Sequence, residues 1–284
     1  MAEHPRSTVL VTGCSSGIGR CIAEGLHARG HRVFASARKA ADVDALRAAG
    51  LEAVELDLDS STSIHRAVDA VLERTGGRLD ALFNNGAYGQ PGAVEDLSRD
   101  ALRAQFETNL FGWVELTNRV LPVMRAQGHG RIVQNSSVLG LVALAYRGAY
   151  VASKFALEGL TDTLRLELRG SGIHVSLIEP GPIESRFRAN AWEAFRRHID
   201  AGHSVHREAY AALAARLRKE GHAAPFTLPP EAVLGRVIHA LESPRPRARY
   251  YVTFPTRLFG TLRRILPTRA LDRILAGTGG GGRR

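Results

Sequence analysis

The sequence predicts an α/β fold in which one doubly wound, mainly parallel sheet is covered by helices on both faces. Short apolar, β-branched runs alternate with amphipathic segments of helix length, and a glycine-rich turn follows the first of these runs. Strands that alternate with helices form βαβ units, whose strands run parallel. The 284 residues, 44% hydrophobic and 23% charged, are enough to bury one large core, which excludes disordered, collagen-like and coiled-coil proteins.

The predicted elements follow one another in a regular order. Strands are predicted at 7–12, 31–36, 52–56, 81–83, 131–136 and 173–178, and helices at 18–28, 42–49, 63–74, 99–127 and 149–168. Between residues 184 and 230 the chain is polar and helix-prone, without a strand pattern. An insertion of this kind after a strand is expected to form a helical lid over a site at the carboxyl ends of the strands.

The net charge of +10 is concentrated near the carboxyl terminus. Ten arginines and one acid, Asp272, lie in residues 245–284, which leaves a charge of +1 for residues 1–244. A nearly neutral body with a basic tail does not indicate a nucleic-acid partner, and we expect none. No apolar run reaches the ~18–20 residues of a membrane-spanning helix, and the first residues lack the apolar core of a signal peptide. The expected compartment is therefore the cytoplasm.

Neither the cysteines nor the histidines predict a metal site. Cys14 and Cys21 are too few for a disulfide framework and have no partners at ligand spacing. His198, His203 and His206 form a loose cluster that we interpret as part of a solvated polar segment.

The glycine-rich turn has the composition of a dinucleotide-binding site. It reads Thr12-Gly13-Cys14-Ser15-Ser16-Gly17-Ile18-Gly19 and opens the first predicted helix. Glycines allow a tight turn and a close approach of the backbone to a pyrophosphate, and the helix N-terminus supplies N–H donors. Glycines also suit a plain βα turn, but the position after the first strand of a βαβ series favours a dinucleotide site.

The end of the second strand indicates which dinucleotide is bound. Sites that prefer NAD place an acid there, ~20 residues beyond the glycines, to bind the ribose 2′-hydroxyl. This strand ends Ser36-Ala37-Arg38-Lys39, with two cations and no acid. Arg38 and Lys39 therefore predict NADP(H), whose 2′-phosphate would pair with them, over an unrelated basic turn.

An acid–base pair is predicted on a later helix. Tyr150 and Lys154 are spaced i, i+4, which places a phenol and an ammonium on one helix face, where the cation favours the phenolate. Ser136 and Ser137 end a strand upstream and offer a hydroxyl for a carbonyl or alcohol oxygen. Strand alternation directs only one of them toward the site, and the spacing to Tyr150 favours Ser137. Asn109 is an unusual residue inside a helix, which indicates a local hydrogen-bonding role.

In this order and spacing, the motifs resemble those of the short-chain dehydrogenase/reductase family, in its single-domain form, over about residues 7–255. The matching positions are TGCSSGIG (12–19), Asp57, Asn84-Asn85-Gly86-Ala87, Asn109, Ser137, YVASK (150–154) and Pro180-Gly181. The sequence is especially similar to bacterial members related to 17β-hydroxysteroid dehydrogenases. The resemblance implies a Rossmann-type, seven-stranded, NADP-binding catalytic domain over residues 1–256, with 184–230 as the substrate lid and 257–284 as a basic amphipathic tail.

The resemblance also implies roles for individual residues. Tyr150 would be the general acid in reduction and the general base in oxidation, while Lys154 would lower its pKa and bind the nicotinamide ribose. Ser137 would hold the substrate oxygen, and Asn109 would bend its helix and keep a water in the proton relay. The full set expected to touch the cofactor is Gly13, Ser15, Ser16, Gly17, Ile18, Gly19, Arg38, Lys39, Asp57 (adenine), Leu58, Asn84 (adenine ribose), Asn85, Gly86, Tyr150, Lys154, Pro180, Gly181, Ile183 (carboxamide) and Ser185.

Two positions depart from the family's usual pattern. The common Asn-Asn-Ala-Gly appears here as Asn-Asn-Gly-Ala, and Ser185 replaces a threonine after Pro-Gly, which keeps the hydroxyl. Neither change is expected to abolish the activity, because the first position acts mostly through its backbone.

The predicted function is hydride transfer between NADP(H) and a carbonyl/alcohol pair. The segment 184–230 carries Phe187, Trp192 and Phe195 with few acids, which favours an apolar substrate such as a steroid, retinoid, fatty aldehyde or ketone, although these aromatics would equally suit a lid core. The alternative is a catalytically silent NADP-binding regulatory protein on the same fold. We expect a homodimer or homotetramer.

The tail has two interpretations. Leucines and isoleucines recur at helical spacing on both sides of Pro267, which is expected to split the segment into two short helices, with arginines on the polar side. The pattern fits a surface that packs on the domain or on another subunit, and it also fits an anchor on an anionic membrane.

Overall fold

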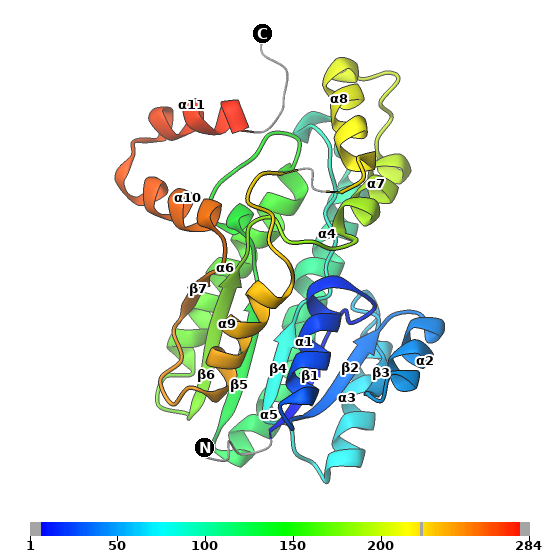
Figure 1. Ribbon diagram of the computed structural model, residues 1–284, viewed down its shortest axis with the longest axis vertical. Helices are drawn as coiled ribbons and strands as arrows, with labels where there is room; N and C mark the ends of the chain where they lie inside the picture. Colours follow the sequence, from blue (N-terminus) through cyan, green and yellow to red (C-terminus); the bar gives the residue numbers. More distant parts are fainter. Residues whose placement is uncertain (1–6, 222–223, 279–284) are drawn as a thin grey trace.

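The computed structural model describes residues 7–221 and 224–278, and a single seven-stranded sheet runs through its centre (Figure 1). The strands are β1 (Thr8–Val11), β2 (Arg32–Ala37), β3 (Glu52–Glu55), β4 (Ala81–Asn84), β5 (Gly130–Asn135), β6 (Ile173–Glu179) and β7 (Arg249–Tyr251). Their order is β3-β2-β1-β4-β5-β6-β7, and each neighbouring pair is parallel. The order reverses between β1 and β4, and sheets of this kind bind ligands at that point, beyond the carboxyl ends of the strands.

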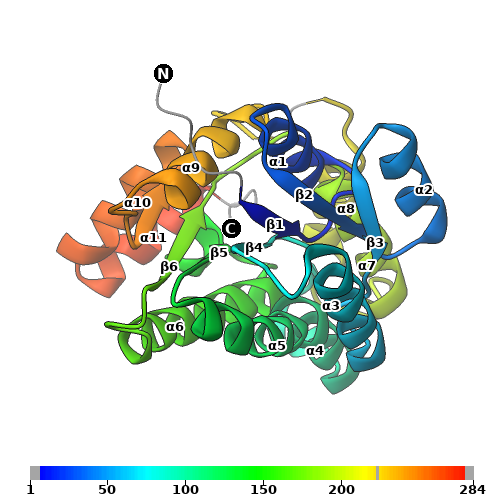
Figure 2. The same ribbon diagram turned by 90° about the horizontal axis from the view of Figure 1, so that it is seen from below.

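Helices cover both faces of the sheet (Figure 2). They are α1 (Gly17–Ala28), α2 (Ala40–Ala48), α3 (Ser61–Thr75), α4 (Arg99–Phe106), α5 (Gly112–Gln127), α6 (Gly148–Glu167), α7 (Phe187–His198), α8 (Arg207–Arg218), α9 (Glu231–Glu242), α10 (Phe254–Ile265) and α11 (Thr268–Thr278). Ile22 of α1 and Val237 of α9 belong to the apolar cluster on one face, together with residues of α2. Ile64 of α3 and Leu116 of α5 belong to the cluster on the other face, together with residues of α6.

The predicted doubly wound α/β fold is confirmed, and β1 to β6 lie within two residues of their predicted positions. Two elements differ from the residue pattern. β7 has only three residues, Arg249–Tyr251, too few to show an apolar alternation. The predicted helix over 99–127 is interrupted by a π-helical turn at Glu107–Phe111, where one extra residue per turn is accommodated.

The region predicted as a lid contains α7 and α8, which lie beyond the carboxyl ends of the strands (Figure 1). Phe195 and Tyr210 pack with Leu97 and Ala149 in a third apolar cluster, separate from the two that cover the sheet. Trp192 packs against the same cluster, whereas Phe187 faces the ring of Tyr150 at 5.3 Å between centroids. Of these four aromatic side chains, Phe187 alone therefore lies toward the site.

The tail forms two helices, and the predicted break at Pro267 is confirmed. α10 packs on the body, where Arg263 donates to the carbonyl of Leu141 and lies over the ring of Phe155. α11 has no buried residue and stands away from the sheet (Figure 1). No helix within the described ranges is long and apolar enough to cross a membrane. Residues 279–284 of the predicted tail lie outside the described residues.

Candidate active site

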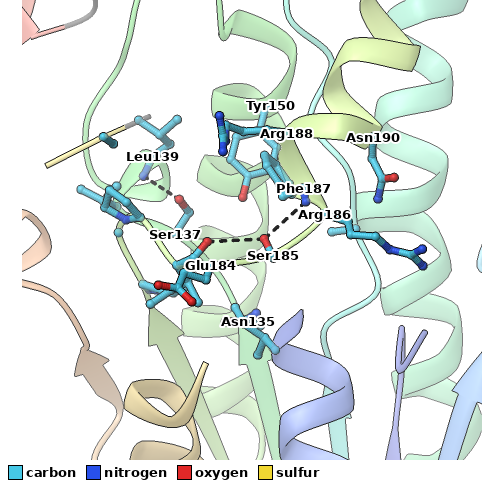
Figure 3. Close-up of a pocket in the computed structure, with 18 of the residues that line it drawn as sticks. Asn135, Ser137, Leu139, Tyr150, Glu184, Ser185, Arg186, Phe187, Arg188 and Asn190 are labelled. Carbon is cyan, nitrogen blue, oxygen red and sulfur yellow. Dashed lines mark hydrogen bonds between the residues drawn. The ribbon is translucent and has the colours of Figure 1, made fainter. Parts of the chain in front are cut away.

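A cavity of about 680 Å³ opens at the carboxyl ends of β1, β4, β5 and β6 (Figure 3). Its floor comes from the glycine-rich turn and the ends of β4 and β5, and its roof from the loop after β6 and the α7–α8 segment. The predicted site residues that line it are Gly13, Ser15, Ser16, Ile18, Asn85, Gly86, Ser137, Tyr150, Lys154, Pro180, Gly181, Ile183 and Ser185. The fold thus brings most of the predicted site together from five separate segments.

The glycine positions of the turn leave no space for side chains. Gly13 and Gly17 have φ angles of +71° and +57°, and a Cβ on Gly19 would lie 2.2 Å from the carbonyl oxygen of Gly13. α1 begins at Gly17, and the side chain of Ser16 does not cap it, so the first N–H groups of the helix remain available to an anion. A turn built from bare backbone beside a helix N-terminus fits a dinucleotide pyrophosphate.

Asn85 holds this turn against the sheet. Its Nδ2 donates to the carbonyls of Thr12 and Gly13 at 2.9 and 3.3 Å, and its Oδ1 accepts from Asn135 at 2.9 Å. Asn84 lies elsewhere: it is fully buried, donates to Thr117 on α5 at 3.1 Å and does not line the cavity. The contact of its side chain with an adenine ribose, implied by the family resemblance, is therefore not supported by this geometry.

Tyr150, Ser137 and Lys154 converge on one side of the cavity. Ser137 follows β5, accepts a hydrogen bond from the N–H of Leu139 at 3.1 Å and has its hydroxyl near the phenol of Tyr150. Lys154 donates to the carbonyl of Asn135 at 2.7 Å. Ser136 also lines the cavity, but its hydroxyl lies beside Glu158. The arrangement favours Ser137 over Ser136 as the hydroxyl that works with Tyr150.

Burial shifts the pKa values of both groups on α6. It raises the pKa of Tyr150 to about 12, with the nearby hydroxyl of Ser137 opposing the shift. It lowers the pKa of Lys154 to about 7, with the charge of Glu158 opposing it. The expected lowering of the Tyr150 pKa is not found here, because desolvation of the phenolate outweighs the attraction of a lysine that burial itself discharges. Tyr150 is therefore protonated at neutral pH, as a proton donor in reduction must be.

Asn109 lies in the π-helical turn and is fully buried. It accepts from the N–H of Tyr88 at 3.1 Å and donates to the carbonyl of Tyr88 at 2.9 Å. Its Nδ2 also lies 3.3 Å from the hydroxyl of Ser153, one residue before Lys154. The predicted local hydrogen-bonding role is thus visible, although Asn109 does not itself line the cavity.

Four predicted cofactor residues lie outside the cavity, at the ends of β2 and β3. Arg38 and Lys39 are exposed, and neither is in an ion pair with any residue that the structure describes. The end of β2 adjoins the glycine-rich turn, since the N–H of Cys14 donates to the carbonyl of Ser36 at 2.7 Å. Asp57 and Leu58 follow β3, and Leu58 packs beside Gly86.

Sequence reasoning missed the residues on the far side of the cavity. Leu144 and Arg147 come from the loop before α6, and Arg216 and Leu217 come from α8. Arg147 had a local signal, because it precedes Tyr150 by three residues, which is about one helical turn. Arg216 had none, because its place at the cavity depends on how α8 packs.

The glycine-rich turn and the cluster of Ser137, Tyr150 and Lys154 define a dinucleotide-binding oxidoreductase. Residues 7–195 match the family model described as short chain dehydrogenase. The chain is 44% identical over 272 residues to "Uncharacterized oxidoreductase YbbO" of Escherichia coli, covering 96% of this chain and 95% of that protein. It is 36% identical over 263 residues to human 17-beta-hydroxysteroid dehydrogenase type 1, covering 87% and 78%.

A solved short-chain dehydrogenase/reductase from Burkholderia phymatum, in complex with NAD, is similar with a TM-score of 0.77 and 27% identity over 97% of both chains. The chain belongs to the short-chain dehydrogenase/reductase family, and it is an oxidoreductase with a site for a nicotinamide cofactor.

Proposed function

We propose that the protein is an NADP(H)-dependent enzyme that interconverts a carbonyl and an alcohol on an apolar substrate. The observation that carries the proposal is that Ser137 and Tyr150 lie together at the cavity wall, with Lys154 one turn further along α6. A bound nicotinamide supplies or accepts the hydride. Ser137 holds the substrate oxygen, and Tyr150 gives that oxygen a proton in reduction and takes it back in oxidation.

The catalytic proposal is tested by replacing Tyr150 with Phe, which keeps the ring and removes the proton. In NADPH-oxidation assays with aldehydes and ketones of increasing chain length and ring count, turnover should fall ~10²–10⁴-fold while NADPH affinity is retained. Ser137→Ala should act similarly, whereas Ser136→Ala serves as the matched control. Retention of more than about a tenth of the turnover by Tyr150→Phe would contradict the mechanism.

The same panel separates the enzyme from a silent regulatory protein. A regulatory protein would bind NADPH and oxidise it with none of the substrates, and its properties would not depend on Tyr150. Since Ser137, Tyr150 and Lys154 all line a cavity of about 680 Å³, we favour the enzyme.

The choice of NADP(H) rests on Arg38 and Lys39, two exposed cations with no acid beside them at the end of β2. A charge-assisted bond to a 2′-phosphate is worth about 1.5–3 kcal/mol, so Arg38→Asp should weaken NADPH binding ~10–100-fold. NADH lacks this phosphate and is the internal control, with its affinity little changed. Tighter binding of NADH than of NADPH by the unaltered protein would refute the assignment.

An apolar substrate is supported by the side chains around Tyr150. Leu139, Leu144, Phe187 and Leu217 line the cavity together with the tyrosine ring. A steroid, a retinoid and a fatty aldehyde or ketone share the extended apolar body that such a wall accommodates.

We further propose that the tail contacts anionic membranes from the cytoplasmic side. Phe254, Leu258 and Ile265 share one face of α10 and are 57%, 39% and 67% exposed. Beside them, a second cavity of about 480 Å³ is lined by Arg236, Arg247, Arg257 and Arg264, none of which is in an ion pair with a described residue. An apolar stripe bordered by cations fits a surface of anionic headgroups.

Co-sedimentation with vesicles tests this contact. The full chain should sediment with anionic vesicles at low salt, stay in solution with neutral ones, and be released by high salt. Removing residues 257–284 should abolish binding without unfolding the body. A full chain that stays in solution with anionic vesicles at low salt would assign the tail to protein packing instead, for example in the homodimer or homotetramer that we propose, which light scattering would detect.

A further inference from the structure

The cavity wall opposite the glycine-rich turn carries an arginine that the proposed hydride transfer does not use. Arg147 immediately precedes α6 and lies three residues before Tyr150, so both side chains reach the same end of the cavity. The recess beside it, between the loop 144–147 and α8, is also lined by Arg147 and Arg216. Two arginines therefore line the same part of the cavity.

Arg147 is not neutralised by the protein. Among the described residues, the one hydrogen bond of its guanidinium is a long contact of 3.5 Å to the carbonyl of Tyr146, its own neighbour in the chain. It makes no ion pair with any residue in the ranges 7–221 and 224–278. Burial, together with the charge of Arg216, lowers the pKa of Arg147 to about 10. Arg147 is half-buried, and a half-buried cation next to a second cation is costly unless an anion binds there.

Within the described residues, no other charged side chain that lines the cavity forms an ion pair with Arg147. Arg188 is engaged with the carbonyls of Lys219 and Gly221, and so ties α7 to the end of α8. Glu184 is the single acid among the lining residues; it is exposed and belongs to the loop after β6. Arg186 is exposed and extends away from Tyr150 (Figure 3).

We infer that the substrate carries an anionic oxygen group, a carboxylate or a phosphate, which Arg147 binds with the help of Arg216 while the carbonyl lies at Ser137 and Tyr150. The inference rests on the proposed function and narrows its substrate class from apolar carbonyls to amphiphilic ones. The apolar part of the substrate lies against Leu144, Phe187 and Leu217, and the anion lies at the arginine pair. The planar guanidinium of Arg147 suits both groups, because each offers two oxygens to its paired N–H donors.

Matched substrates test the inference in the whole enzyme with NADPH. An ω-oxo fatty acid, its methyl ester and an ω-oxoalkyl phosphate of the same length differ only in the terminal group. We expect kcat/KM for at least one anionic compound to exceed that for the ester ~10–100-fold, as a charge-assisted bond provides. The ratio of acid to phosphate then identifies which anion the site prefers.

Substitution of Arg147 should remove this preference alone. Arg147→Gln is expected to lower kcat/KM for the anionic substrate to that of the ester, with ester turnover and NADPH affinity unchanged. Arg147→Lys should restore part of the preference, because it keeps the charge but loses the paired donors. Arg186→Gln, at an exposed arginine of the cavity rim, is the control and should leave the ratio unchanged.

A binding measurement keeps the inference testable if no substrate turns over. Without cofactor neither decanoate nor decanol can react, and titration calorimetry should then show tighter binding of decanoate than of decanol to the unaltered protein and equal binding of the two to Arg147→Gln. The thermal midpoint of Arg147→Gln should stay level or rise, since a half-buried charge that has no ion pair with a described residue is removed. Equal kcat/KM for acid, phosphate and ester, equal binding of decanoate and decanol, or a marked fall in the thermal midpoint would overturn the inference.

Discussion

The two walls of the cavity differ in what holds their central polar side chains. On the cofactor wall, Asn85 bonds to both the glycine-rich turn and Asn135, and Lys154 bonds to the carbonyl of Asn135. On the substrate wall, Arg188 bonds to the carbonyls of Lys219 and Gly221, but among the described residues the Arg147 guanidinium has just the long contact to its neighbouring carbonyl. The cofactor wall is therefore cross-linked around Asn135 for a constant ligand, whereas Arg147 retains binding capacity for a specific substrate.

A similar contrast separates the apolar clusters. The residues that cover the two faces of the sheet come from helices along the whole domain, whereas α7 and α8 pack in a small cluster with residues 93–101, which include the start of α4, and with Ala149 of α6. An element held by its own small cluster opens at a lower free energy than one that shares the main core. We therefore expect substitutions in the sheet to cost global stability, and substitutions in the α7–α8 segment to cost local order.

The largest expected effect lies in the sheet, at Arg249 of β7. Its guanidinium contacts Glu158, and it lies 2.7 Å from Glu179 and 2.6 Å from Asp162. Glu179 has no exposed surface. Arg249→Met leaves buried carboxylates uncompensated and should lower the free energy of unfolding by about 3–5 kcal/mol in urea denaturation at pH 8.

The free energy of unfolding that Arg249→Met loses should become smaller as the pH falls. Burial and the charge of Glu158 raise the pKa of Glu179. Without Arg249 the carboxylates take up protons in the folded state, so the folded state binds more protons and its deficit shrinks as the pH falls from 8 to 6. Arg245→Met, at a nearby exposed arginine, is the control. A deficit that is independent of pH would contradict this account.

The contrast between the walls also explains what the sequence could predict. The glycine-rich turn and the Tyr150–Lys154 pair are local patterns, because each is made by residues within one turn or one helix. The neighbouring ends of parallel strands follow from the βαβ order, whereas Ser137 is assigned to Tyr150 from its spacing along the chain and from the family resemblance. Arg216, in contrast, reaches the cavity only through the packing of α8, and the partners of Arg249 come from α6 and β6. Contacts between segments of this kind leave no periodic signal in the chain.

Gly19 should show the next largest effect and tests the close packing of the cofactor wall. A Cβ at this position would meet the carbonyl oxygen of Gly13 at 2.2 Å, and the backbone would have to move. Gly19→Ala should cost about 1–3 kcal/mol of stability and weaken NADPH binding at least ~10-fold. Gly235→Ala in α9, where nothing lies within 4 Å of the new Cβ, should instead stabilise by about 0.5–1 kcal/mol. Normal NADPH affinity in Gly19→Ala would show that the turn is less tightly packed than we describe.

The protonation state of Lys154, on the same wall, can be measured through the pH dependence of stability. In the folded protein it releases its proton above about pH 7, whereas in the unfolded chain it does so only near ~10.4. The unfolded state therefore binds more protons in between, and stability should rise with pH there, by at most about 2 kcal/mol from pH 7 to 8.5. Lys154→Met should lack this rise in urea denaturation without cofactor, and the exposed Lys219→Met should keep it. Parallel pH profiles for Lys154→Met and the unaltered protein would mean that burial does not discharge this lysine.

Tyr210 should show the most local effect, and it tests most sharply whether the α7–α8 segment is an independent unit. Its hydroxyl bonds to Asp96 and accepts from the N–H of Ala93 at 2.9 Å, which connects α8 to the loop before α4. Tyr210→Phe leaves that buried N–H without its partner, which costs about 1–3 kcal/mol of local free energy. Hydrogen exchange should therefore accelerate in α7 and α8, while amides of α1 and α5 keep their rates, because the opening does not involve the sheet. Tyr146→Phe is the matched control, since the structure gives its hydroxyl no hydrogen bond to any described residue, and it should leave exchange unchanged. If Tyr210→Phe accelerated exchange in α5 to the same degree, the segment would open only with the whole domain, and the division into a rigid cofactor wall and a separately ordered substrate wall would be wrong.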